Sequence, residues 1–137
     1  MSSATIYRHA EDRPMDETSG EIGSDFSMDV CRDWELAFNT LELNDTRRII
    51  MRTSIVIGKN GGAFGPMTNL VCFGLGGKQG SGKQMVSWIH ESDLVGVVDW
   101  MLSGQAEGVY NVTAPGPIQN KLFMRHLRRA QGVTLGI

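Results

Sequence analysis

The stretch MVSWIHESDLVGVVDWML, residues 85–102, decides the fold that we predict for this chain. Its first five residues alternate apolar and polar side chains, as a strand does, and the following apolar residues recur at helical spacing. The polar corner HESD, residues 90–93, joins the two. In an open α/β sheet such a corner lies at the carboxyl end of a strand, where ligands bind. His90, Ser92 and Asp93 are therefore the first candidates for a ligand site.

The same corner also has a purely structural interpretation. Ser92 or His90 can cap the following helix, and Glu91 and Asp93 favour the positive end of its dipole. The capping preferences favour this role for Ser92. For His90 and Asp93, the structural role and ligand binding remain equal alternatives.

Length and composition limit the class of protein. With 137 residues, we expect one domain with its own core. The formal net charge of −2 gives no electrostatic reason to expect nucleic-acid binding. Cys31 and Cys72 have no CxxC or metal-ligand spacing, so we expect no metal site and a reduced, cytoplasmic location. No apolar run has the length needed to cross a bilayer, so we expect no membrane association.

Predicted strands and helices alternate along the chain. Strands are predicted at 3–8, 47–57, 85–89 and 108–112, and helices at 26–43, 63–73, 90–102 and 119–130. This order favours an α/β fold with three layers and a mostly parallel sheet. The polar residues 9–24 read as a surface loop, and their number suggests that the loop arches over another part of the fold.

The helix predicted at 26–43 carries a stripe of apolar residues that we expect to be buried. Asp25 or Ser24 can cap its start. Because further apolar residues lie off the stripe, we expect burial on more than one side, against the chain's own fold or a partner subunit. The stripe consists of Phe26, Val30, Trp34, Ala37, Phe38 and Leu41, and the additional residues are Met28, Leu36 and Leu43.

Residues 77–83, GKQGSGK, fit the first seven places of a P-loop. The eighth place requires a Ser or Thr hydroxyl for a magnesium ion, and this chain has Gln84 there. The context also differs, because a predicted helix precedes the loop and a strand follows it. We therefore interpret residues 74–83 as a flexible glycine-rich connection across the top of a site.

Four stretches together resemble the extended short-chain dehydrogenase/reductase family, most closely its uncharacterised nucleotide-sugar epimerase-like branch. The resemblance implies that residues 1–137 form a single truncated domain: the C-terminal part of a Rossmann-like fold, without the earlier strands that carry the family's glycine motif and most of its cofactor site. The matching stretches are SSATIY at 2–7, MRTSIVIG at 51–58 with Gly61 and Gly62, the glycine-rich residues 74–82 followed by 88–94, and GVYNV at 108–112.

The resemblance carries over only part of the family's catalytic set. Ser3 matches the serine that helps to hold the substrate hydroxyl. Counted back from Glu35, the positions of the family's Tyr-x-x-x-Lys hold Ser27 and Cys31. A serine hydroxyl is a poor general base, and a cysteine has no positive charge to lower a neighbour's pKa. Tyr7 matches a tyrosine of the strand motif and does not replace the missing one.

Three hypotheses for the function follow. The first is a non-catalytic relative that binds a small polar ligand, sugar- or nucleotide-like, with no cofactor bound by the isolated chain. The second is an NAD(P)-dependent epimerase or oxidoreductase completed by another chain. The third is an interaction protein that works as an oligomer, and we expect at least a homodimer because an unpaired strand edge at 3–8 needs a cover. The candidate ligand-binding residues are Ser3, Thr53, Ser54, His90, Ser92 and Asp93.

Overall fold

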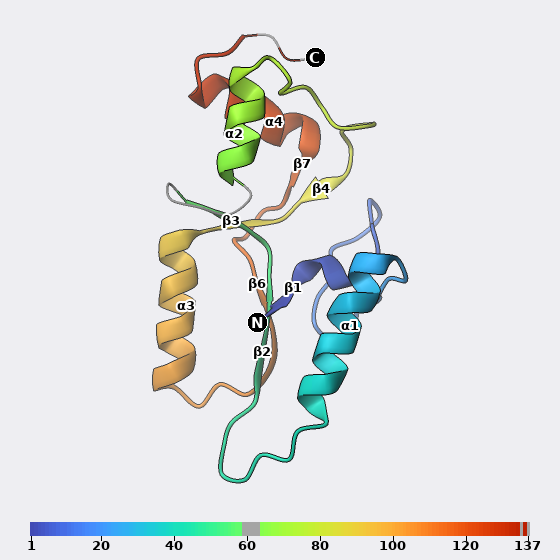
Figure 1. The fold of residues 1–137 in the computed structure, drawn as a ribbon, viewed down its shortest axis with the longest axis vertical. Helices are drawn as coiled ribbons and strands as arrows, with labels where there is room; N and C mark the ends of the chain where they lie inside the picture. Colours follow the sequence, from blue (N-terminus) through green and yellow to red (C-terminus); the bar gives the residue numbers. More distant parts are fainter. Residues whose placement is uncertain (59–63, 135, 137) are drawn as a thin grey trace. The chain divides into compact units, whose positions relative to one another are not determined.

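The computed structural model describes residues 1–58, 64–134 and 136, and it has the α/β fold with mostly parallel strands that the sequence predicts (Figure 1). The chain forms two compact units. Unit 1 contains Met1–Ser54 and Ser92–Thr113, and unit 2 contains Ile55–Glu91 and Ala114–Ile137. No helix among the described residues is long and apolar enough to cross a membrane.

The sheet of unit 1 has three parallel strands. β2 (Ile49–Thr53) lies between β1 (Ser2–Ser3) and β6 (Gly108–Val112). Helices α1 (Phe26–Asn39) and α3 (Glu91–Ser103) lie on opposite sides of these strands, which gives the three predicted layers (Figure 1). Parallel strands covered on both faces explain why β2 is rich in Ile and Met.

Helix α3 is fixed to the sheet of unit 1 near its C-terminal end. The ring of Trp100 meets Tyr110 of β6 edge to face, with 5.7 Å between the ring centroids. The guanidinium of Arg47 donates hydrogen bonds to the carbonyl oxygens of Met101, at 3.0 Å, and Ala106, at 2.9 Å. Because the last carbonyls of a helix have no partner within it, Arg47 satisfies at Met101 a group that would otherwise need water.

The strand predicted at 3–8 is much shorter in the structure. β1 ends at Ser3, and a single 3-10 turn, η1 (Ala4–Ile6), follows. The hydroxyl oxygen of Ser3 accepts a hydrogen bond from the backbone N–H of Thr5 at 3.2 Å, which favours the turn. Tyr7 returns to an extended backbone and makes an isolated antiparallel bridge with Ile22.

The N-terminal cap of α1 is as predicted, but its buried face is not. Asp25 accepts a hydrogen bond from the backbone N–H of Met28 at 3.1 Å. Most of the predicted apolar stripe is exposed within the described chain, with Phe26 at 85% and Trp34 at 59% exposure, whereas Val30 and Phe38 are half-buried. The residues that α1 buries are Met28, Cys31 and Glu35. The helix also ends at Asn39 rather than near residue 43.

Unit 2 contains two strand pairs and two helices. β3 (Ile55–Ile57) pairs in parallel with β5 (Trp88–His90), and β4 (Met85–Val86) pairs antiparallel with β7 (Ile118–Gln119). Helices α2 (Phe64–Cys72) and α4 (Asn120–Ala130) pack together. Their core consists of Val71, Phe123, Met124 and Leu127. The strands predicted at 47–57 and 85–89 are therefore each two strands, interrupted at Ser54 and Ser87.

The glycine-rich residues 74–83 follow α2 and precede β4, so the context of a P-loop is absent, as predicted. Several hydrogen bonds hold the segment to α4. The side-chain oxygen of the buried Asn120 accepts one from the backbone N–H of Gln79 at 2.8 Å, the backbone N–H of Lys121 donates one to the carbonyl oxygen of Gly82 at 3.0 Å, and Arg128 donates one to the carbonyl oxygen of Gly76. Gly61 and Gly62, which belong to one of the stretches that carry the family resemblance, lie outside the described residues.

Candidate functional site

The carboxyl ends of β1 and β2 bring three predicted site residues together. Ser3 lies opposite Thr53 in the parallel register, and Ser54 follows directly. The Ser54 hydroxyl donates a hydrogen bond to the carbonyl oxygen of Val112 at 3.1 Å, so a structural contact already uses this donor. The hydroxyl oxygen of Thr53 is buried and has no hydrogen-bond partner within the described residues. Buried polar groups are normally paired, so the hydroxyl of Thr53 stands out among these three residues.

The structure does not group the predicted polar-corner residues, His90, Ser92 and Asp93, with these three hydroxyl residues. Ser92 and Asp93 are exposed in the first turn of α3, in unit 1. Because α3 begins at Glu91, the prediction that Ser92 caps it is wrong, and His90 holds the position directly before the helix. His90 is exposed, ends β5 and belongs to unit 2. The structure thus groups Ser3, Thr53 and Ser54, and the grouping with His90 stays a prediction.

A hollow of about 280 Å³ lies beside Ser3 in unit 1. Ser3, Ser27 and Cys31, the three positions that match catalytic residues of the family, all line it. The hollow therefore lies where the resemblance places catalysis. Its other lining residues are Thr5, Phe26, Val30 and Trp34. None of these described lining residues is basic, so the hollow does not fit the phosphates of a dinucleotide.

The Cys31 thiol cannot supply the charge of the family's lysine. Burial raises the pKa of Cys31, and the negative charge of the neighbouring Glu35 raises it further. The thiol is therefore neutral at pH 7. A neutral thiol neither lowers the pKa of Ser27 nor pairs with an anionic ligand.

Behind this site lies a buried ion pair that the sequence did not lead us to predict. Arg52 of β2 donates two hydrogen bonds to Glu35 of α1, from Nη2 to Oε2 at 2.7 Å and from Nε to Oε1 at 2.9 Å. The hydroxyl of Ser2 donates a third to Oε1, at 2.7 Å. Burial alone would raise the pKa of Glu35, but the hydrogen bonds from Arg52 and Ser2 outweigh it and lower the pKa. The hydrogen bonds to Glu35 in turn raise the pKa of Arg52.

The pair extends into a chain of hydrogen bonds across the sheet. Arg52 Nη1 donates to the hydroxyl oxygen of Tyr7 at 2.7 Å, and that hydroxyl donates to the side-chain oxygen of Asn111 at 2.8 Å. The Arg52 guanidinium also lies 5.1 Å from the centre of the Tyr7 ring. Both hydrogen-bonding roles of the Tyr7 hydroxyl are thus used inside the fold. A single charged residue at an inward position of an apolar strand, Arg52, was the sequence signal for this network.

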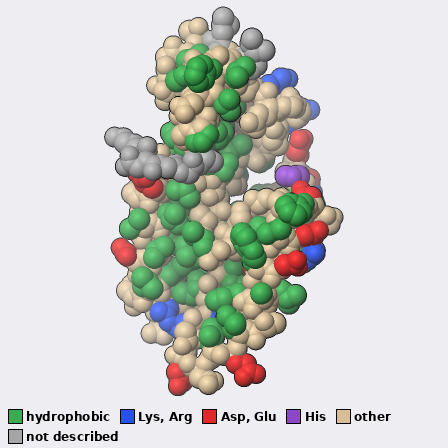
Figure 2. Space-filling model, viewed as in Figure 1, with side chains coloured by type: hydrophobic (Ala, Val, Ile, Leu, Met, Phe, Trp, Pro, Cys, Tyr) green, Lys and Arg blue, Asp and Glu red, His purple; other side chains and the backbone are tan. Residues whose placement is uncertain are grey.

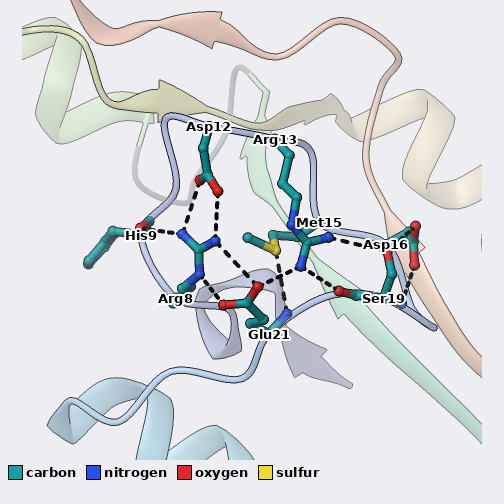
Figure 3. Close-up of polar contacts among 8 residues, drawn as sticks. All are labelled: Arg8, His9, Asp12, Arg13, Met15, Asp16, Ser19 and Glu21. Carbon is teal, nitrogen blue, oxygen red and sulfur yellow. Dashed lines mark hydrogen bonds and ion pairs between the residues drawn. The ribbon is translucent and has the colours of Figure 1, made fainter.

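The loop 9–24 covers Tyr7 and the end of β6, as its length suggested. The side-chain nitrogen of Asn111 donates to the backbone oxygen of Met15 at 3.3 Å, and Met15 packs against the cluster that contains Tyr7. Figure 3 shows how ion pairs hold this loop in shape: Arg8 contacts Asp12 and Glu21, and Arg13 contacts Glu21.

No group of three or more His, Cys, Asp or Glu side chains in the described part of the chain is arranged to hold a metal ion. The chemistry that the site offers is hydrogen bonding from hydroxyl groups beside an apolar wall.

The chain is similar to proteins named as epimerases, although no protein-family profile matches it. It is 34% identical over 130 residues to an epimerase family protein of Mycobacterium leprae, across 94% of this chain and 42% of the relative. The crystal structure of human epimerase family protein SDR39U1 with NADPH matches 99% of this chain and 46% of its own, with 33% identity and a TM-score of 0.88. This chain corresponds to the C-terminal part of an epimerase-family fold.

The structure of a nucleoside-diphosphate sugar epimerase from Corynebacterium glutamicum agrees, with 31% identity, a TM-score of 0.79 and coverage of 96% of this chain and 28% of that one. The resemblance to extended short-chain dehydrogenase/reductases is thereby confirmed. The chain spans less than half the length of these epimerase-family relatives.

Proposed function

We propose that this chain is the substrate-side part of an epimerase-family fold and binds a small polar ligand, sugar- or nucleotide-like, without transferring hydride. The observation that carries the proposal is the buried hydroxyl of Thr53, which has no partner among the described residues and lies opposite Ser3 at the strand ends. Leaving such a group unsatisfied costs about 1–3 kcal/mol, so a ligand hydroxyl that pairs with it gains binding free energy.

A sugar fits this place because its hydroxyls both donate and accept hydrogen bonds. The hydroxyls of Ser3 and Thr53 offer the same two roles in return. Ser92 and Asp93, exposed in the same unit, and His90 of unit 2 are the further ligand-binding residues that we propose. The similarity to the Corynebacterium protein, a nucleoside-diphosphate sugar epimerase, supports this class of ligand.

The absence of hydride transfer follows from two side chains. Ser27 and Cys31 stand where the family has its tyrosine and lysine, and both line the hollow beside Ser3. Neither provides an acid/base group with a pKa near neutrality, which proton transfer during catalysis requires.

Calorimetry on the full chain tests the proposal with UDP-glucose, UDP and NADPH as separate ligands. We expect UDP-glucose to bind, and Thr53→Val to weaken its affinity at least about tenfold, which corresponds to the loss of one useful hydrogen bond, about 1.4 kcal/mol. Thr46→Val is the matched control, because Thr46 is exposed and its hydroxyl contacts the backbone oxygen of Asn44. If Thr53→Val leaves the affinity for UDP-glucose unchanged, the assignment of Thr53 to the ligand site is wrong. If the chain alone binds NADPH tightly, the proposal that it binds the substrate and not the cofactor is wrong.

An oligomeric interaction protein is the second candidate, favoured by the exposed apolar side chains of α1. Figure 2 shows apolar side chains on the surface over this helix, and Leu36 and Trp34 are 63% and 59% exposed. Such clusters commonly mark interfaces. Light scattering at micromolar concentration tests it: a homodimer would support this candidate, and a stable monomer would argue against it.

A further inference from the structure

The charges of this chain are divided unequally between its two units. The residues of unit 1 include fourteen Asp and Glu but only six Lys and Arg, whereas those of unit 2 include seven Lys and Arg and a single acidic residue, Glu91. The overall net charge of −2 conceals this division. Because the sign of the charge on a unit decides which ligands it attracts, we expect unit 2 to attract anions.

Three lysines of unit 2 belong to the glycine-rich segment or lie beside it. Lys78 and Lys83 are part of the segment, and Lys121 lies in the first turn of α4. A Cβ atom at Gly82 would lie 3.0 Å from the Cβ of Lys121 and 3.1 Å from the Cβ of Lys78, so these two side chains start close together. All three lysines are exposed, and within the described chain none of their side chains forms an ion pair or hydrogen bond. Their like charges repel one another unless an anion lies between them.

Hydrogen bonds from side chains fix the backbone between these lysines. The side-chain nitrogen of the buried Asn120 donates to the side-chain oxygen of Gln79 at 3.3 Å, and Gln84 Nε2 donates to the backbone oxygen of Gln79 at 2.9 Å. The backbone N–H groups of Gly80 and Ser81 donate to no other described residue. Exposed N–H groups of a glycine-rich turn, together with lysine side chains, are suited to hold phosphate oxygens. We call Lys78, Lys83 and Lys121, with the backbone of Gly80 and Ser81, the lysine cluster.

We propose that the lysine cluster binds the phosphate groups of a small anion, of which pyrophosphate is the simplest probe. Lysine binds phosphate as a point charge, and several ammonium groups can contact one phosphate group. Binding without hydrolysis does not require the magnesium-binding hydroxyl that a P-loop has in the place of Gln84. A long polyanion is less favourable, because the net charge of −2 gives no long-range attraction toward the whole chain. The cluster lies within unit 2, so the proposal is independent of the ligand site at Thr53.

Calorimetry of the full chain with inorganic pyrophosphate tests this inference. We expect one binding site per chain and an affinity that falls as the salt concentration rises. Lys78→Gln and Lys121→Gln should each weaken the affinity at least about fivefold, because each removes one charged contact to the anion. Arg129→Gln is the matched control: it removes one positive charge from an exposed position of the same helix, about 12 Å further along its axis. We expect the control to change the affinity less than about twofold.

Three results would overturn the inference, provided that circular dichroism shows each variant to be folded. The first is no binding of pyrophosphate at millimolar concentration. The second is an equal loss of affinity in Lys121→Gln and Arg129→Gln, which would mean that the charge of unit 2 as a whole attracts the anion. The third is a single-stranded oligonucleotide that binds more tightly than pyrophosphate and is weakened by Arg129→Gln, which would identify a nucleic-acid interface.

A further variant separates this site from the proposed ligand site. Thr53→Val should leave the affinity for pyrophosphate unchanged, because Thr53 belongs to unit 1 and pyrophosphate has no sugar hydroxyl. A loss of pyrophosphate binding in this variant would show that the assignment to the lysine cluster is wrong. Failure of pyrophosphate to bind leaves the result for UDP-glucose and Thr53 unaffected, so the two proposals fail separately.

Discussion

At the scale of single residues, Arg52 and Glu35 show how unit 1 is fixed behind its candidate site. Their side chains are only 10% exposed and share two hydrogen bonds between β2 and α1. A buried ion pair is not by itself strong evidence for stability, because both charges lose their hydration. Removing one partner is different, because the remaining charge is then buried without compensation.

We therefore expect Arg52→Leu to lower the free energy of unfolding by about 3 kcal/mol, since the Glu35 carboxylate then keeps the hydrogen bond from the Ser2 hydroxyl but loses its opposite charge. Urea unfolding followed by circular dichroism measures the change. Arg32→Leu is the control on the same helix, where Arg32 and Asp29 form an exposed pair. That substitution is expected to cost less than about 1 kcal/mol. Equal losses from both substitutions would show that burial does not distinguish the two pairs.

At the scale of elements, the ion pairs that hold the loop 9–24 lead us to expect a pH-dependent stability. Hydrogen bonds from Arg8, and next from Arg13, lower the pKa of Glu21 from 4.5 to about 2. A carboxyl group with a lowered pKa in the folded state stabilises the fold fully above its ordinary pKa, and this stabilisation is lost as the pH falls through the lowered value. The contribution of Glu21 is thus present above about pH 4.5 and disappears toward about pH 2.

The melting temperature is therefore expected to fall between these pH values, and Glu21→Gln should make the fall less steep. Scanning calorimetry at several pH values measures both. Glu42→Gln, an exposed change outside this loop, serves as the control and should leave the pH dependence as it is in the unchanged chain. If the slopes of the two variants agree, the contacts of Arg8 and Arg13 do not hold the loop in solution.

The elements also show what a single sequence can and cannot predict. Propensity and capping placed α1, α2 and α4 within a few residues, because Asp25 and the helical spacing act locally. The apolar stripe of α1 faces away from the chain's own core, so its burial against a partner subunit, the other alternative, stays a prediction. Periodicity identifies the most apolar face of a helix, and on α1 that face is exposed, whereas Cys31 and Glu35 face inward. An apolar helix face that binds another molecule has the same sequence pattern as an apolar face that packs against the chain's own core.

The same limit applies to the candidate site. Ser3 and Thr53 were predictable, because the carboxyl ends of parallel strands lie at one edge of a sheet. Nothing in the sequence indicated different roles for the neighbouring hydroxyls of Thr53 and Ser54. In the structure, the hydroxyl of Ser54 donates a hydrogen bond to the carbonyl oxygen of Val112. The hydrogen-bond partner of a hydroxyl can lie far away in the chain, as Val112 lies 58 positions from Ser54. The local sequence pattern carries no information about such distant partners.

At the scale of the whole molecule, the backbone agrees with the epimerase-family structures, whereas two positions that match catalytic residues of the family differ. The backbone follows human SDR39U1 with a TM-score of 0.88, but the positions of the family's tyrosine and lysine hold Ser27 and Cys31. If those two side chains decide the chemistry, then joining the N-terminal part of a relative to this chain should give cofactor binding without turnover. A single polypeptide that joins the N-terminal part of human SDR39U1 to this chain separates the two properties.

We expect this joined protein to bind NADPH and to leave it unoxidised. With an oxidised 4-keto sugar nucleotide present as the hydride acceptor, the absorbance of NADPH should stay constant, and chromatography should detect no reduced sugar nucleotide. The physical reason is that Ser27 and the neutral Cys31 provide no group to donate or accept the proton that accompanies hydride transfer. Substrate-dependent loss of NADPH would mean that another side chain performs this step. The non-catalytic part of the proposed function would then be wrong, while the ligand site at Ser3 and Thr53 would stand.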